Sequence, residues 1–155
     1  MAVMMQESSC EKGAVNGDSI GLMQINTGFT RADNKGAIGW CSDYGLSQNK
    51  DKCKKQLLDP SVNLNVGTRI LKSHFDTFGE DKNTYENKVK SKCKVENLQK
   101  KYLSYNNKWE MALRAYNGFG CGVSGADNNY VENVGKKYVN LVLEYNNLKR
   151  ETTLV

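Results

Sequence analysis

The sequence is short of proline, of histidine and of long apolar runs. Its one proline excludes collagen-like and proline-rich disordered classes. No apolar run approaches the roughly 18 residues that a membrane-spanning helix needs, so no such helix is expected. The one histidine, His74, cannot build a histidine-rich metal site, and C-x-x-C pairs do not occur. We therefore expect neither a bound metal nor another cofactor.

Length and charge describe one small globular unit. The 155 residues suffice for one compact domain and are too few for two with separate cores. Lys and Arg number 22 against 17 Asp and Glu, a formal charge of +5. This charge is a mild bias toward anionic partners, or only the sign of a solvated lysine-rich surface. Because a dense basic stripe with interleaved aromatic residues is missing, we expect no nucleic-acid partner.

Five cysteines are scattered along the chain, at Cys10, Cys41, Cys53, Cys93 and Cys121. This density suits an oxidising compartment, and buried free thiols in a reducing one are the alternative. We predict a disulfide between Cys41 and Cys53, because these two bracket a polar loop of 11 residues. The other three then give one more pair and one free thiol. The first five residues lack the basic and apolar regions of a signal peptide, so we expect either a cytosolic protein or an export signal already removed.

Two helices have clear sequence signals. Asp59-Pro60 places an N-cap before a proline at the first helical position, and apolar residues at helical spacing continue to Phe78, where Gly79 ends the helix. Near the C-terminus, apolar residues recur every three or four positions from Val131 to Leu148. Both patterns predict amphipathic helices.

The other segments give weaker signals. We expect a truncated helix over residues 1–10, a turn region over 12–21 and mostly loop with short helical pieces over 26–58. The polar stretch 80–108 suggests a surface helix or hairpin, and a short helix follows from Trp109 until Gly118 breaks it. No convincing strand pattern appears. The fold class is therefore mainly α.

Three polar residues are candidates for a catalytic or ligand-binding site. Glu7 follows an apolar stretch, so its carboxyl could lie at the rim of the core, where desolvation raises the pKa and keeps an acid protonated. A protonated carboxyl is what cleavage of a glycosidic bond needs. A solvated helix position is the alternative. Gln24 lies in an apolar run and Asn117 at a helix end, where each could bind a ligand or form a turn.

Five short motifs occur in order along the chain. They are Glu7-Ser8-Ser9; Gly21-Leu22-Met23-Gln24-Ile25-Asn26; Asp59-Pro60 with Asn63 or Asn65 and Gly67; Ala115-Tyr116-Asn117-Gly118; and Tyr130-Val131 with Asn133-Val134. Together they resemble the soluble lytic transglycosylase family over residues 2–142. The resemblance implies a lysozyme-like fold of the goose-type class, with one domain over residues 1–150, polar insertions near 27–58 and 80–108, and a frayed tail over 151–155.

The resemblance also implies an activity and a set of site residues. Members cleave the β-1,4 bond between N-acetylmuramic acid and N-acetylglucosamine in peptidoglycan. Carried over by position, Glu7 is the single acid and base, Met23 and Gln24 line the sugar cleft, Tyr116 and Asn117 form its opposite wall, and Tyr130 points back toward the acid. One carboxylate suffices because the C6 hydroxyl of the muramic sugar attacks C1 and closes a 1,6-anhydro ring.

Departures from the family pattern point to a subclass. Asn26-Thr27 stands where many members have proline, which looks more like small transglycosylases of secretion systems, conjugation machines and phages. Ala126 replaces the usual carboxylate before Tyr130, with Asp127 beside it. We therefore expect a periplasmic or cell-wall enzyme that acts on glycan strands beside proteins of a secretion or envelope machine.

Two other functions stay open at this stage. One is a hydrolytic muramidase, in which Asp18, Asp33 or Asp43 activates water. The other is a non-catalytic wall-binding or scaffold protein, against which the joint presence of Glu7, Gln24, Tyr116 and Asn117 counts. Mass analysis of the released wall fragments separates the three.

Overall fold

The computed structural model describes residues 1–28, 41–121 and 127–152. The chain is mainly helical, as predicted, and divides into two compact units. The first unit comprises residues 1–68 and 137–155, and the second comprises residues 69–136. Residues 153–155 of the expected tail lie outside the described residues.

The first unit begins with the expected short helix, α1 (Ala2–Glu7), and continues into a small sheet. Strands β1 (Val15–Asn16), β2 (Ser19–Ile20) and β3 (Ile25–Asn26) pair antiparallel in sequence order. The sequence showed no convincing pattern for these strands. Each strand is only two residues long, so none could show an alternating pattern. The turns between strands depend on Gly17 and Gly21, which have φ values of 60° and 74°.

The helix predicted at Asp59-Pro60 is confirmed as α3 (Pro60–His74). The Asp59 carboxylate accepts hydrogen bonds from the backbone N–H groups of Ser61 at 2.8 Å and Val62 at 3.2 Å, which is N-capping. A π-helical turn, η1 (Phe75–Gly79), extends the helix to the predicted end. Gly79 is required there because a Cβ atom would lie 2.7 Å from the carbonyl oxygen of Lys108.

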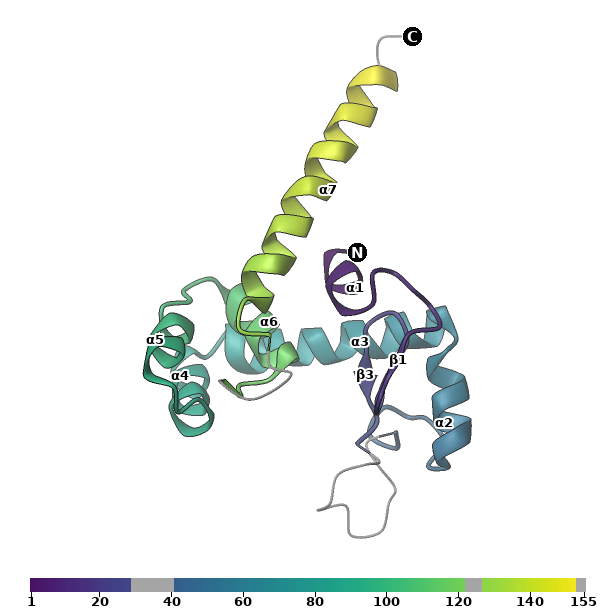
Figure 1. Cartoon of the computed structure of the whole chain (residues 1–155), viewed down its shortest axis with the longest axis horizontal. Helices are drawn as coiled ribbons and strands as arrows, with labels where there is room; N and C mark the ends of the chain where they lie inside the picture. The colour runs from purple at the N-terminus through teal and green to yellow at the C-terminus, as the bar shows by residue number, and fades with distance from the viewer. Residues whose placement is uncertain (29–40, 122–126, 153–155) are drawn as a thin grey trace. The chain divides into compact units, whose positions relative to one another are not determined.

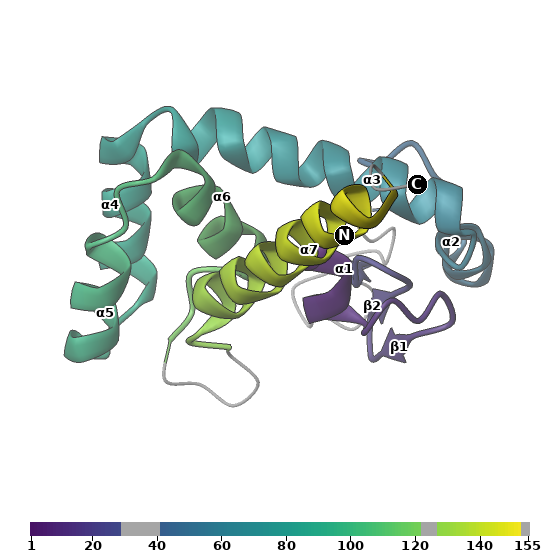
Figure 2. The ribbon, with the colours of Figure 1, turned by 90° about the horizontal axis from the view of Figure 1, so that it is seen from above.

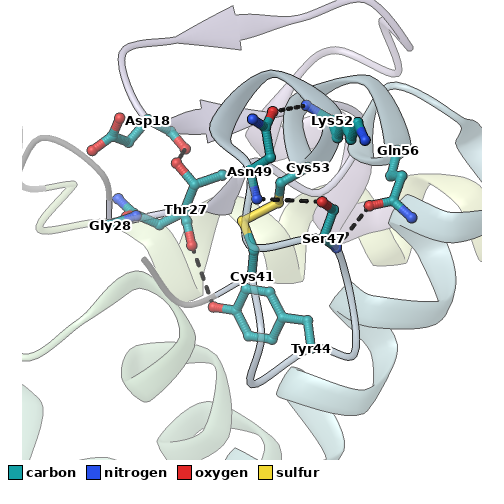
Figure 3. Close-up of a disulfide and its surroundings, with 11 residues drawn as sticks. Asp18, Thr27, Gly28, Cys41, Tyr44, Ser47, Asn49, Lys52, Cys53 and Gln56 are labelled. Atoms are coloured by element: carbon teal, nitrogen blue, oxygen red, sulfur yellow. Dashed lines mark hydrogen bonds between the residues drawn. A yellow bond between two sulfur atoms is a disulfide. The ribbon is translucent and has the colours of Figure 1, made fainter. Parts of the chain in front are cut away.

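The predicted disulfide between Cys41 and Cys53 is present and buried (Figure 3). It ties residue 41 and the segment after it to helix α2 (Lys50–Leu57), whose first turn is capped by Asn49. The loop is also fixed by polar bonds, because the backbone N–H of Ser47 donates to Gln56 Oε1 at 2.9 Å. The hydroxyl of Tyr44 donates to the carbonyl oxygen of Asn26 at 3.3 Å. A polar segment with few apolar residues is thus ordered by a covalent bond and hydrogen bonds.

In the second unit, the stretch 80–108 is helical, in line with the expected surface helix or hairpin, but some of its side chains are buried. It forms α4 (Lys82–Lys92) and α5 (Glu96–Leu103), which lie side by side in both views (Figures 1 and 2). Tyr85, Val89 and Tyr102 are fully buried. Apolar residues are sparse in this stretch, but their side chains are large. The hydroxyl of Tyr85 donates to the carbonyl oxygen of Tyr102 at 3.0 Å. Few, bulky side chains fill this core.

The short helix predicted after Trp109 is confirmed as α6 (Lys108–Asn117). Asn107 and Glu110 form a capping box at its start, and Gly118 with φ of 90° ends it. A second disulfide joins Cys93 at the end of α4 to Cys121, and Cys10 is an exposed free thiol. The expectation of two pairs and one free cysteine is therefore confirmed.

The last predicted helix is confirmed as α7 (Tyr130–Thr152), but its apolar face is buried only at the start. Val131 and Val134 are 6% and 4% exposed, whereas Tyr138, Tyr145 and Leu148 are 61%, 65% and 62% exposed. Periodicity therefore predicted the helix and not the burial of its face. Within the described residues, no helix is both long and apolar enough to cross a membrane.

Candidate active site

Glu7 is the last residue of α1 and is half-buried. The next residue, Ser8, holds this helix end in place. Its backbone N–H donates to the carbonyl oxygen of Met4 at 2.9 Å, and its hydroxyl donates to the carbonyl oxygen of Leu22 at 2.9 Å. The second bond joins the end of α1 to the turn that carries Met23 and Gln24. The first unit therefore fixes Glu7 relative to that turn.

The turn after β2 is built around a fully buried amide, Asn63 of α3. Its Oδ1 accepts the backbone N–H of Met23 at 2.8 Å. Its Nδ2 donates to the carbonyl oxygens of Ile20 at 2.8 Å and Leu57 at 2.9 Å. Both hydrogens and the oxygen of this amide are thus used, as a buried polar group requires. Gly21 leaves the space, because a Cβ atom there would lie 2.3 Å from Asn63 Nδ2.

The structure places the two predicted cleft residues of this turn differently. Met23 is 3% exposed and lies against Gly67, where an added Cβ atom would be 2.4 Å from the Met23 sulfur. Gln24 is half-buried and has a positive φ of 47°. Its Nε2 donates to the carbonyl oxygens of Gly21 at 3.0 Å and Ala14 at 3.3 Å. The nitrogen of Gln24 therefore stabilises the turn, and its oxygen is the end suited to a substrate donor.

In the second unit, Tyr116 and Asn117 end α6 and are both half-buried. The ring of Tyr116 meets His74 edge-on, with ring centroids 6.3 Å apart, and His74 lies 5.9 Å from the ring of Phe78. Burial lowers the pKa of His74 below its usual value, which favours the neutral imidazole beside Tyr116. This aromatic cluster fixes the tyrosine ring without placing a charge next to it.

Arg114 is a residue that the sequence interpretation missed. It lies on α6 and is 1% exposed. Its Nε donates to the carbonyl oxygen of Gly118 at 2.9 Å, its Nη1 donates to that of Asp127 at 2.9 Å, and its Nη2 donates to Asn117 Oδ1. The guanidinium also lies over the ring of Tyr102, 4.6 Å from the centroid. The sequence held one signal for its burial, because Arg114 follows Met111 by three residues and so shares the apolar face of the predicted helix.

Tyr130, the last predicted site residue, begins α7 and is 1% exposed. Asp127 precedes it, and its Oδ1 accepts the backbone N–H of Asn129 at 3.0 Å, which opens the helix. Ala126, the position of the missing carboxylate, lies outside the described residues. One turn into α7, Glu132 accepts from the hydroxyl of Tyr105 at 2.9 Å. Burial would raise the Glu132 pKa, but its hydrogen bonds, including those from Lys101 and Tyr105, outweigh burial and hold it low.

The aspartates considered for a hydrolytic mechanism have different environments. Asp18 is half-buried, and its backbone carbonyl accepts from the N–H of Thr27 at 2.9 Å. Asp43 is exposed in the loop closed by the first disulfide. Asp33 lies outside the described residues. Among residues 1–28, 41–121 and 127–152, no group of three or more His, Cys, Asp or Glu side chains could hold a metal ion.

The site residues thus fall into two sets. Glu7 and the turn with Met23 and Gln24 belong to the first unit, and Tyr116, Asn117 and Tyr130 belong to the second. No curated protein and no solved structure matches the chain significantly. The family model described as the transglycosylase SLT domain matches residues 1–140, which is most of the chain and includes both sets. This match and the helical structure confirm a lysozyme-like fold, and the chain belongs to the transglycosylase SLT domain family.

Proposed function

We propose that this protein is a peptidoglycan lytic transglycosylase that cleaves the β-1,4 bond after N-acetylmuramic acid and leaves a 1,6-anhydro end. The family match supports lytic transglycosylase activity on peptidoglycan in general. The observation that carries the assignment of the acid is the bond from Ser8 Oγ to Leu22. It fixes the end of α1, and with it Glu7, to the turn that bears Gln24. A general acid must be held in this way relative to its substrate.

In this mechanism Glu7 acts twice. It first protonates the oxygen of the leaving sugar, and it then accepts the proton of the C6 hydroxyl as that oxygen attacks C1. An intramolecular nucleophile has a large proximity advantage, so a second carboxylate is not needed. The surroundings of Asp43 support this proposal, because its side chain is exposed to solvent in the loop closed by the first disulfide.

The remaining site residues form the sugar-binding surfaces in this proposal, one set in each unit. Gln24 in the first unit, and Tyr116 and Asn117 in the second, are the residues proposed to contact sugars. Met23 and Tyr130 are 3% and 1% exposed, so we expect them to support these contact residues, each within its own unit. A single catalytic domain over residues 1–150 is also part of the proposal.

We place the enzyme in the periplasm or cell wall, where it would open the wall locally for a secretion or envelope-spanning machine. Two disulfides in a small domain support an oxidising compartment. Asn26-Thr27 supports the small, specialised subclass. The partners in this proposal are glycan strands and proteins of that machine.

The test is mass analysis of fragments released from purified peptidoglycan in heavy-oxygen water. Wild-type protein should release ends lighter by about 18 Da than reducing ends, without label, because no water is added. Glu7→Gln should lower the rate by about 1,000-fold or more, since an amide cannot transfer the proton. Glu11→Gln is the matched control, because Glu11 is an exposed carboxylate four residues further on. It should retain full activity.

Other outcomes identify the alternatives. Labelled reducing ends would show a hydrolase and make Asp18→Asn and Asp43→Asn the next variants. An inactive wild-type protein that still binds peptidoglycan would show a scaffold. Retention of a tenth of the activity in Glu7→Gln would exclude Glu7 as the acid.

A further inference from the structure

Arg114 is a buried charge with an unusual set of partners. Its side chain is 1% exposed, and arginine does not lose its proton in proteins, so the guanidinium is buried as a cation. In the described part of the chain no carboxylate forms an ion pair with it. Its acceptors are two backbone carbonyls and one side-chain amide. Burying a cation is unfavourable without good acceptors, so the choice of these three needs an explanation.

The amide is the side chain of Asn117, one of the predicted substrate-binding groups. A guanidinium can only donate hydrogen bonds, so the atom of Asn117 that faces it has to be Oδ1. The opposite rotamer would set the NH₂ group of Asn117 against the NH₂ group of Arg114. Arg114 therefore determines which end of the Asn117 amide is available to a ligand. That end is Nδ2, which carries two hydrogens and can only donate.

Because Nδ2 of Asn117 can only donate, it would bind a ligand through a hydrogen-bond acceptor. The acceptor that distinguishes peptidoglycan sugars from simple hexoses is the carbonyl oxygen of the acetamido group. We propose that Arg114 is a positioning residue that orients Asn117 as a hydrogen-bond donor to an acetamido carbonyl of the glycan. This inference rests on the proposed function, because it names the substrate group that one residue of that site recognises.

The other two bonds of Arg114 explain why arginine stands here. Gly118 directly follows Asn117, and Asp127 lies three residues before Tyr130, so the guanidinium joins both ends of the segment that links α6 to α7. The ring of Tyr102 supports the guanidinium from one face. A lysine has one nitrogen and cannot donate in this planar pattern to three separate acceptors. Arg114→Lys should therefore keep the charge and lose the orientation of Asn117.

The test measures binding, so that it does not depend on catalysis. In a Glu7→Gln background, which prevents turnover, dissociation constants are measured for two probes. One is soluble, fully N-acetylated glycan strands, and the other is the same strands after chemical de-N-acetylation. The readout is the dissociation constant for de-N-acetylated strands divided by that for N-acetylated strands. This ratio measures the preference for N-acetylated strands. One neutral hydrogen bond should make this ratio about fivefold to tenfold larger in the parent protein than in Asn117→Ala.

The variants separate orientation from general stability. Asn117→Asp can still accept from Arg114 but has no donor, so it should lose the preference for N-acetylated strands without a fall in melting temperature. Arg114→Lys should lose most of the preference, and adding it to Asn117→Ala should change nothing further, because it acts through Asn117. Tyr85→Phe is the matched control. It removes a buried hydrogen bond of the same unit, to the carbonyl oxygen of Tyr102 at 3.0 Å, and should leave the ratio unchanged.

Three results would overturn the inference. They are a parent protein that binds both strands equally, an unchanged ratio in Arg114→Lys, or equal losses in Tyr85→Phe and Arg114→Lys. Failure of the proposed function is recognised separately, by wild-type protein that releases no anhydro ends from peptidoglycan.

Discussion

Removal of the disulfide between Cys93 and Cys121 should destabilise the protein strongly. The two cysteines are 28 positions apart, and both are buried, with exposed fractions of 0% and 7%. In the chain-entropy model, a loop of this length contributes about 3.5 kcal/mol by restricting the unfolded chain. Unfolding free energies of domains are typically about 5–15 kcal/mol, so Cys93→Ala with Cys121→Ala should remove a quarter to two thirds of the stability.

The assay is equilibrium unfolding in urea, followed by circular dichroism, for three variants of the protein. Cys41→Ala with Cys53→Ala removes the shorter loop, 12 positions, and should lose about 3 kcal/mol. Cys10→Ala is the control, because Cys10 is exposed and unpaired, and it should lose nothing measurable. Losses below about 1 kcal/mol for both pairs would refute the reasoning that these bonds order polar segments with little core of their own.

Three further perturbations follow from the same structure. Gly21→Ala should lose more than about 2 kcal/mol in urea unfolding, because its φ of 74° disfavours a side chain and the new Cβ atom would lie 2.3 Å from Asn63 Nδ2. Asn63→Asp should lose about 2–4 kcal/mol in the same assay, since a carboxylate would face the carbonyl oxygens of Ile20 and Leu57 that its amide now donates to, and an unchanged stability would contradict the hydrogen-bond assignment. Burial holds the folded-state pKa of His74 below the ordinary value of 6.5, so its contribution to stability is present above about pH 6.5 and lost as the pH falls; the melting temperature should drop less on acidification in His74→Phe than in wild-type protein.

The sequence predicted best those features whose cause is local. Asp59-Pro60 specifies its own helix start, since an N-cap carboxylate and a proline act on the first turn alone. Gly118 ends its helix through its own backbone, with a φ of 90°. The pairing of Cys41 with Cys53 followed from the short polar loop between them. In each case the residues that interact are close together in the chain.

Features that depend on distant contacts were missed or misread. The two-residue strands are stabilised by a turn that Asn63 holds from about 40 positions away, and so short a strand has no periodic signal of its own. The burial of Tyr85 and Tyr102 results from the packing of α4 and α5, which sparse apolar residues do not reveal. The role of Arg114 depends on the carbonyl of Asp127, which lies 13 positions further along the chain. A charged residue is expected at the surface unless its acceptors are known.

The side-chain amides of Gln24 and Asn117 show that ligand binding and turn formation do not exclude each other. An amide has a donating and an accepting end, and a turn needs only one of them. Gln24 uses its nitrogen on the carbonyl oxygens of Gly21 and Ala14, so its oxygen remains the accepting end. Asn117 uses its oxygen on Arg114, so its nitrogen remains the donating end. An acetamido group carries one N–H and one carbonyl, and every sugar of a peptidoglycan strand bears such a group. Each amide, fixed within its own unit, therefore presents the end that matches one of these two groups of an N-acetylated sugar.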